Sequence, residues 1–281
     1  MSREAGRTLC LFAWHGASLA VSCPDGRWCE RLSDLLGLAA DPVYDRPLDI
    51  RVHDELNLRC FETELNFNSQ CDLLIWLSLT IFDVLAEAAG AFLLHAAALR
   101  VGGGLVLLPG PPRAGKSTLA LRAGTRGFRV IGDDVVAISP TTLEAEAAPR
   151  PLRERIPAGE LLPCGTNALA PGRPLEGRLD GEACRLYPRE IGGPATRLTV
   201  ISICFLNRHS GPGIHFQTPQ SFVATRQLLD HARAFGPRPM DSLTAVAKLI
   251  GRCDCVMLSV GDGETNTALD ALSKRYHLGL T

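Results

Sequence analysis

The stretch from Gly110 to Thr118 holds the residues best suited to chemistry, because it fits the pattern G-x-x-x-x-G-K-[ST]. In such a loop the backbone N–H groups surround a phosphate chain, the lysine reaches the β- and γ-phosphates, and the hydroxyl is a magnesium ligand. The residues predicted to bind the nucleotide are Gly110, Pro111, Pro112, Arg113, Ala114, Gly115, Lys116, Ser117 and Thr118. Arg113 is expected either to contact phosphate or to face solvent. The sequence therefore predicts a site for a nucleoside triphosphate.

The segments on either side of this loop are suited to hold it at the start of a helix. Residues 105–108 form a short apolar run that predicts a buried strand, and residues 117–123 favour a helix. A helix N-terminus offers unpaired N–H groups and about half a positive charge, so an anion is stabilised there. We therefore expect the phosphates to lie at this helix start.

A histidine upstream of the loop is predicted to lie beside it. The glycines at 102–104 predict a tight hairpin between an apolar strand at 92–101 and the strand that leads into the loop. If the turn centres on Gly102 and Gly103, the numbers of cross-strand partners sum to about 205. His95 would then lie opposite Gly110, at the mouth of the loop, and we predict a functional role for it.

Two adjacent carboxylates follow the next predicted strand. Residues 128–131 favour a strand that ends at Asp133 and Asp134. The short crossover from the loop predicts that the two strands are parallel neighbours, with their carboxyl ends at the edge of the sheet where ligands gather. One carboxylate could hold magnesium together with Ser117, and the other could accept the proton of an acceptor hydroxyl. Lys116 would neutralise phosphate charge.

In their order and spacing, His95, the loop from Gly110 to Ser117 and the segment 127–134 resemble the bacterial HPr serine kinase/phosphorylases, and more closely the HPr-kinase-related kinases. The resemblance is specific over residues 95–138. It implies an α/β fold with a mixed sheet, the P-loop variant that HPr kinases share with phosphoenolpyruvate carboxykinases. The implied reaction is Mg²⁺-dependent transfer of the γ-phosphate of ATP to a serine or threonine hydroxyl of a protein or peptide.

The resemblance also implies a role for each site residue. Lys116 and Ser117 would bind the triphosphate and magnesium, Asp133 and Asp134 would supply the general base and a metal contact, and His95 would support these carboxylates. In the metal site, Ser117 would be joined by Asp134. A faint counterpart of the family's second motif is found at Glu190–Gly193. The same resemblance suggests a homo-oligomer.

Two other functions remain open from the residues alone. The first is a kinase for a small metabolite on the same scaffold. The second is a nucleotide-gated binding module that uses bound nucleotide to organise loops for a partner and transfers no phosphate. The paired carboxylates beside the loop favour an enzyme over such a module.

Composition narrows the class of protein and its partners. The chain has 281 residues, a net charge of −1 and no strongly basic stretch, which argues against a nucleic-acid partner. Its ten cysteines are scattered, so we expect reduced thiols in a cytoplasmic protein. The uncharged run at 73–82 is too short to span a membrane and predicts a buried helix, so no membrane partner is expected.

The order of predicted elements suggests two domains. Residues 1–68 are expected to form a small α/β lobe with β-like runs at 9–13, 18–22 and 48–52 and an amphipathic helix at 29–38. Residues 69–281 are expected to form the kinase domain, which begins with a long helix at 71–89. Within it, the proline-rich stretch 140–195 predicts mobile loops or a solvated insert. A strand at 198–206, a helix at 241–249, a strand at 255–260 and a helix at 265–276 would follow.

Overall fold

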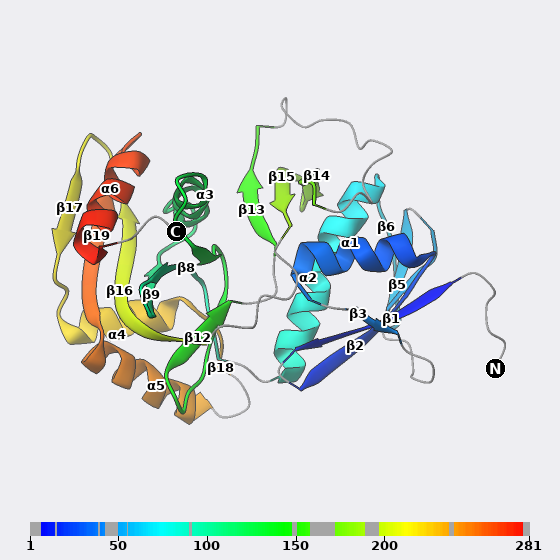
Figure 1. Cartoon of the computed structure of the whole chain (residues 1–281), viewed down its shortest axis with the longest axis horizontal. Helices are drawn as coiled ribbons and strands as arrows, with labels where there is room; N and C mark the ends of the chain where they lie inside the picture. The colour runs from blue at the N-terminus through cyan, green and yellow to red at the C-terminus, as the bar shows by residue number, and fades with distance from the viewer. Residues whose placement is uncertain are drawn as a thin grey trace. The chain divides into compact units, whose positions relative to one another are not determined.

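A computed structural model describes residues 7–14, 16–38, 40–42, 50–54, 56–89, 92–147, 151–157, 172–188, 197–235 and 239–277. The chain divides into two compact units (Figure 1). Unit 1 comprises Met1–Ala89 and Pro149–Pro194, and unit 2 comprises Gly90–Ala148 and Ala195–Thr281. This division differs from the expected boundary at residue 68, and it assigns most of the stretch 140–195 to the N-terminal unit.

Unit 1 is built on a six-stranded mixed sheet of order β3-β1-β2-β4-β5-β6, in which β2 and β4 pair in parallel. The strands are β1 (Thr8–Trp14), β2 (Ala17–Cys23), β3 (Ala40–Pro42), β4 (Ile50–Val52), β5 (Asn57–Cys60) and β6 (Thr63–Asn66). Helix α1 (Gly26–Leu36) begins where the Asp25 carboxylate accepts a hydrogen bond from the Arg27 N–H. It ends at Gly37, whose φ of 66° is readily adopted by glycine.

The long helix α2 (Gln70–Ala89) explains why the boundary falls after residue 89. It packs on β1 and β2, where the Trp14 and Phe82 rings lie 5.8 Å apart. It also contacts strand β14 (Leu175–Leu179). There the Arg178 N–H donates to Asp72 Oδ1 (2.5 Å). An apolar helix needs cover on several sides, and the sheet and β14 together provide it.

The described part of the proline-rich stretch contains strands where loops were expected. Strand β12 (Glu144–Ala147) belongs to unit 2, while β13 (Leu152–Arg155), β14 and β15 (Glu182–Tyr187) form a three-stranded antiparallel sheet of order β13-β15-β14 in unit 1. Arg185 of the central strand pairs with Glu176 (2.7 Å) and Glu154 (3.2 Å) on its two neighbours. Cross-strand ion pairs of this kind each add a modest contribution to the stability of a sheet.

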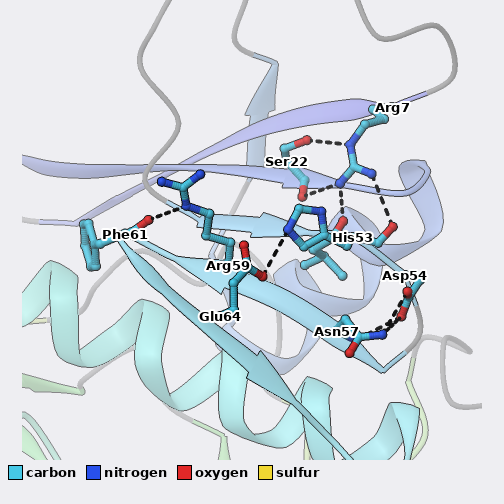
Figure 2. A network of polar contacts seen from close by, with 9 residues as sticks. Arg7, Ser22, His53, Asp54, Asn57, Arg59, Phe61 and Glu64 are labelled. Atoms are coloured by element: carbon cyan, nitrogen blue, oxygen red, sulfur yellow. Dashed lines mark hydrogen bonds and ion pairs between the residues drawn. The ribbon is translucent and has the colours of Figure 1, made fainter.

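Polar contacts join the strands of the unit 1 sheet (Figure 2). The Arg7 guanidinium donates to Ser22 Oγ (3.0 Å) on β2 and to the carbonyl oxygen of Val52 on β4. His53 Nε2 lies 3.3 Å from Glu64 Oε2. The Asp54 carboxylate accepts from the turn that precedes β5, including the Asn57 N–H (2.9 Å). These contacts stabilise the parallel β2–β4 pair and the turn that follows it.

The cysteines depart from the expectation of reduced thiols. A disulfide joins Cys10 on β1 to Cys29 on α1, because packing of the helix on the sheet brings their Cα atoms to 6.4 Å. Cys71 is also disulfide-bonded. The other cysteines of the described residues are free thiols: Cys23, Cys60, Cys184, Cys204, Cys253 and Cys255. Among the described helices, none combines the length and the apolar composition that crossing a membrane requires.

Unit 2 contains a ten-stranded mixed sheet. Its main path is β10-β8-β9-β16-β12-β11-β7-β18, and β19 pairs with both β16 and β17. The strands not yet introduced are β7 (Phe92–Leu94), β8 (Ala96–Val101), β9 (Gly104–Pro109), β10 (Val130–Gly132), β11 (Val136–Ile138), β16 (Leu198–Arg208), β17 (Ile214–Gln217), β18 (Ala232–Phe235) and β19 (Asp254–Val260).

Helices cover both faces of this sheet. Among the described residues these helices are α3 (Lys116–Thr125), α4 (Ser221–Asp230), α5 (Pro239–Arg252) and α6 (Thr265–Tyr276). Alternate strand residues bury on opposite faces, as the period of a strand requires: Leu105 and Leu107 pack toward α4 and α5, and Val106 and Leu108 toward α3 and α6. In Figure 1, α3 and α6 lie on one side of the sheet and α4 and α5 on the other. Unit 2 is therefore a three-layer α/β/α sandwich.

The central hairpin has the register predicted from its glycines. Val101 pairs with Gly104 and Ala96 with Pro109, so the numbers of each pair sum to 205. His95 lies one residue beyond this ladder, in the break between β7 and β8. Its own N–H donates to the carbonyl oxygen of His231 (2.8 Å), which joins it to the end of α4.

The predicted pairing of the crossover strands is wrong. β8 lies between β9 and β10 and pairs antiparallel with both, for example through Val130 and Leu99. β8, the hairpin partner of β9, occupies the position beside it. The chain therefore passes over β8 before it re-enters the sheet as β10. β10 nevertheless runs in the same direction as β9. The carboxyl ends of the two strands therefore share one edge of the sheet, as expected.

Candidate functional site

The loop from Gly110 to Gly115 leads from the end of β9 into α3 and leaves the start of that helix uncapped. Gly115, with φ of 92°, is the N-cap, and α3 has neither a side-chain cap nor an acidic residue in its first turn, all within the described residues. Arg113 also has a positive φ, 67°. The first N–H groups of a helix need partners. In α3 no side chain of the described residues caps them.

The loop begins in direct contact with the neighbouring strand. A Cβ at Gly110 would lie 2.6 Å from the carbonyl oxygen of Leu206 on β16 and 3.1 Å from its Cβ. Both atoms belong to a central strand, so neither can move away easily. Glycine at this position therefore lets the loop approach the sheet closely.

Lys116 is buried at the centre of the site, with 6% of its surface exposed. Its Nζ donates to the carbonyl oxygens of Gly110 (2.6 Å) and Pro111 (3.1 Å). Burial lowers the pKa of the ammonium, while the charges of Asp134 and Asp133 act in the opposite direction. The lysine of the loop and the two carboxylates after β10 thus interact electrostatically.

The two carboxylates differ in their surroundings. Asp133 is buried, with 3% exposed. Asp134 Oδ1 lies 3.0 Å from Nδ1 of His95. The structure therefore brings together Lys116, Asp133, Asp134 and His95, which lie on three separate segments of the sequence. His95 is placed to fix the orientation of the Asp134 carboxylate.

His231 is a member of this group that the sequence did not indicate. It lies at the end of α4, and burial, followed by the charges of Lys116 and His95, lowers its pKa to about 4. The residue reaches the site because β18, which begins at Ala232, pairs with β7 at Leu94. No local pattern marks this pairing, so the sequence held no signal for it.

Arg208 is a second residue that sequence reasoning missed. It is the last residue of β16, and a Cβ at Gly115 would lie 3.4 Å from its Nη2 and 3.5 Å from its Nε. Its Nη1 lies 3.6 Å from Oδ1 of Asp262. The strand at 198–206 was expected, and the rule that ligands gather at the carboxyl ends of parallel strands could have drawn attention to Arg208, two residues beyond its expected end.

The remaining predicted site residues lie along the loop surface. Ser117 is half-buried in the first turn of α3, while the side chains of Pro111, Pro112, Arg113 and Thr118 are exposed and Ala114 is buried. The segment Glu190–Gly193, expected to echo a family motif, lies outside the described residues.

The donor set fits magnesium in its chemistry. Mg²⁺ prefers oxygen ligands and is held by one or two carboxylates together with substrate phosphates and water, without an all-protein cage. Ser117 and Asp134 offer such oxygens. Within the described ranges no cluster of three or more histidine, cysteine or acidic side chains forms a metal-binding group.

Comparisons with known proteins give distant structural likenesses and no sequence relative. The sequence matches no protein-family profile, and no curated protein matches it. Among solved structures, the HPr(Ser) kinase/phosphatase from Coxiella burnetii matches 66% of this chain and 96% of its own, at 12% identity and a TM-score of 0.30. Values this low indicate only a distant structural relationship.

Proposed function

We propose that this protein is a phosphotransferase that moves the γ-phosphate of ATP, with Mg²⁺, to a serine or threonine hydroxyl of a protein or peptide. The observation that carries the proposal is that Lys116, at the uncapped start of α3, lies within the electrostatic reach of Asp133 and Asp134. A phosphate-binding loop needs the lysine and the helix start. The paired carboxylates add what transfer requires, a base and a metal contact.

The proposed step is an in-line displacement at the γ-phosphorus. The acceptor oxygen forms a bond to phosphorus while the bond from phosphorus to the β–γ bridging oxygen breaks, and ADP leaves with that electron pair. The proton of the hydroxyl passes to the Asp133 carboxylate. Lys116 and the first N–H groups of α3 bind the phosphate oxygens, and His95 holds Asp134 in place.

Bound Mg²⁺ would supply further neutralisation of the phosphate charge. Ser117 and Asp134 are the residues proposed to hold it. Asp133, which is more deeply buried, is left for the proton. Both roles use the ionised carboxylate, as a proton acceptor at Asp133 and as a metal ligand at Asp134.

The test separates binding from transfer with the full-length chain. We expect Asp133→Asn to reduce phosphate transfer by at least about 100-fold, the usual contribution of a general base, while ATP affinity stays within a few fold of wild type. Lys116→Met should instead weaken ATP binding itself, measured by calorimetry. Asp270→Asn, at an exposed carboxylate of α6 in the same unit, is the matched control.

The acceptor class is read from where label from γ-labelled ATP appears in a lysate. Label in macromolecules supports the proposed function, whereas label only in the low-mass fraction would indicate a small-metabolite kinase. Tight nucleotide binding with no transfer to any acceptor would indicate a binding module. Wild-type turnover in Asp133→Asn would refute the role given to that residue.

A further inference from the structure

The edge of the sheet that carries the phosphate-binding loop also carries a second basic group. Strands β9, β16 and β19 run parallel and lie side by side (Figure 1). β9 ends at the loop, while β16 continues to Arg208, which is in register with Val260 of β19. Because β16 extends past the end of β9, its last residue reaches the far side of the loop.

The guanidinium of Arg208 lies against the residue that precedes Lys116. A Cβ at Gly115 would meet Nη2 at 3.4 Å, Nε at 3.5 Å and Cζ at 3.9 Å, which are ordinary contact distances. The planar group therefore covers the α-carbon of Gly115, the N-cap of α3. It lies beside the N–H groups that the loop would present to a phosphate chain.

This placement gathers positive charge where the fold already supplies it. The start of α3 carries the positive end of the helix dipole, and its first turn holds Lys116 and no acidic residue. A cation at a helix N-terminus is destabilising, so a guanidinium positioned there is suited to an anionic ligand. The planar fork of arginine matches two phosphate oxygens at once.

Asp262 is the ion-pair partner of this guanidinium. Its carboxylate lies 3.6 Å from Nη1, and 73% of the Asp262 side chain is exposed. The Asp262 backbone is fixed, because its N–H donates to the carbonyl oxygen of Gly211 (3.1 Å). An ion pair as long and as exposed as this one contributes little free energy, so a phosphate can readily replace the carboxylate.

We propose that Arg208 binds the β- and γ-phosphates of the nucleotide beside Lys116, and that Asp262 is the counter-ion from which the phosphates displace it. This inference rests on the proposed function, because it assigns a further residue to the same nucleotide site. Asp262 acts through Arg208 and is a positioning residue.

Substitutions at Arg208 and at Asp262 are expected to change the affinity for ATP in opposite directions. Arg208→Ala removes a charge-assisted contact, and we expect ATP to bind about tenfold or more weakly. Arg208→Lys keeps the charge without the fork and should recover part of the loss. Asp262→Asn removes the competing carboxylate, so ATP should bind a few fold more tightly.

The experiment is calorimetric titration of Mg-ATP into the full-length protein and these variants. Arg126→Ala is the matched control, because Arg126 also forms an exposed ion pair in unit 2, with Asp270 (2.5 Å), at the other end of α3. If the ion pair served only the structure, Arg208→Ala and Asp262→Asn would both weaken ATP binding. That result would overturn the inference.

The outcomes also separate this inference from the proposed function. If the wild-type protein binds ATP and Arg208→Ala binds it equally well, the role of Arg208 is overturned, while the proposed role of the phosphate-binding loop is unaffected. A wild-type protein that binds no nucleotide would overturn both. Weaker binding in Arg208→Ala, with tighter binding in Asp262→Asn and no change in Arg126→Ala, would support the assignment.

Discussion

Lys116, Asp133 and Asp134 place one positive and two negative charges at the start of α3, and the ammonium is mostly buried. Burial raises the cost of a charge, and the opposite charges of Asp134 and Asp133 offset part of that cost for the Lys116 ammonium. Two of the three ammonium hydrogens are directed to the carbonyl oxygens of Gly110 and Pro111. The lysine therefore also fixes the start of the loop whose ligand it is proposed to bind.

His231 makes this region sensitive to acid. Its pKa falls from the ordinary 6.5 to about 4, first because of burial and then because Lys116 and His95 are nearby; Asp230 acts in the opposite direction. The unfolded chain takes up a proton on this side chain near pH 6.5, and the folded protein does so only near pH 4. Acidification through this window therefore favours the unfolded state, and above pH 6.5 the residue has no effect on stability.

We expect His231→Gln to lessen the loss of unfolding free energy between pH 6.5 and pH 4. The difference from wild type should be on the order of 1 kcal/mol, because the side chain is partly exposed and solvent screens its interactions. Urea unfolding at several pH values measures it, with His215→Gln on the exposed β17 as the control. Parallel pH profiles for wild type and His231→Gln would contradict the assigned shift.

Among the elements, the contact between the phosphate-binding loop and β16 depends on one missing side chain. We expect Gly110→Ala to destabilise the protein by about 1–3 kcal/mol and to abolish nucleotide binding, because the added Cβ would lie 2.6 Å from the Leu206 carbonyl oxygen. Thermal unfolding and ATP titration measure the two effects.

Gly103→Ala is the control for Gly110→Ala, because Gly103 lies in the turn of the β8–β9 hairpin that leads into the loop. A Cβ at Gly103 would meet nothing within 4 Å, and the φ of Gly103 lies outside the left-handed region. The free energy of unfolding of Gly103→Ala should therefore stay within about 0.5 kcal/mol of wild type. Equal effects of the two substitutions would mean that loss of glycine flexibility, and not the contact with β16, explains Gly110→Ala.

Elements with a strong local pattern were predictable from the sequence. The helix at Thr265–Tyr276 was predicted to the residue, and the long helix begins at Gln70, one residue before its predicted start. The hairpin register followed from Gly102 and Gly103, because a tight turn determines which residues face one another. It placed His95 beside the loop, and the structure adds its contact with Asp134.

What the sequence could not give depends on contacts between distant segments. The position of β8 between β9 and β10 is a choice of sheet order that no local pattern records. The strands β13, β14 and β15 are stabilised by strand pairing and by ion pairs such as Arg185 with Glu176. The composition of this stretch, taken alone, predicted loops. His231 and Arg208 reach the site through such pairing, so the local motifs contained only part of it.

At the scale of the whole molecule, the chain leaves unit 1 after Ala89, returns to it at Pro149 and leaves it again after Pro194. All three tryptophans, Trp14, Trp28 and Trp76, belong to unit 1, and every residue proposed to bind nucleotide belongs to unit 2. Tryptophan fluorescence therefore reports the folding of one unit, and nucleotide affinity reports the integrity of the other.

The disulfide between Cys10 and Cys29 allows unit 1 to be weakened selectively. The bond joins residues 19 apart, and a loop of this size corresponds to about 3 kcal/mol of stability in the chain-entropy account. We expect the double variant Cys10→Ala, Cys29→Ala to lose about that much in urea unfolding followed by tryptophan fluorescence. Its affinity for ATP at 25 °C should match wild type.

Cys23→Ala controls for the loss of buried sulfur, because Cys23 is a fully buried free thiol on β2, in the same sheet. Its cost reflects one cavity, and the double variant removes two buried sulfur atoms, so the loss beyond twice the cost of Cys23→Ala measures the cross-link. ATP added at 100 times its Kd should stabilise unit 2 by about 2.7 kcal/mol in every one of these proteins. If ATP affinity instead fell in step with the fluorescence-detected stability, the nucleotide site would depend on unit 1, and assignment of the site to unit 2 alone would be wrong.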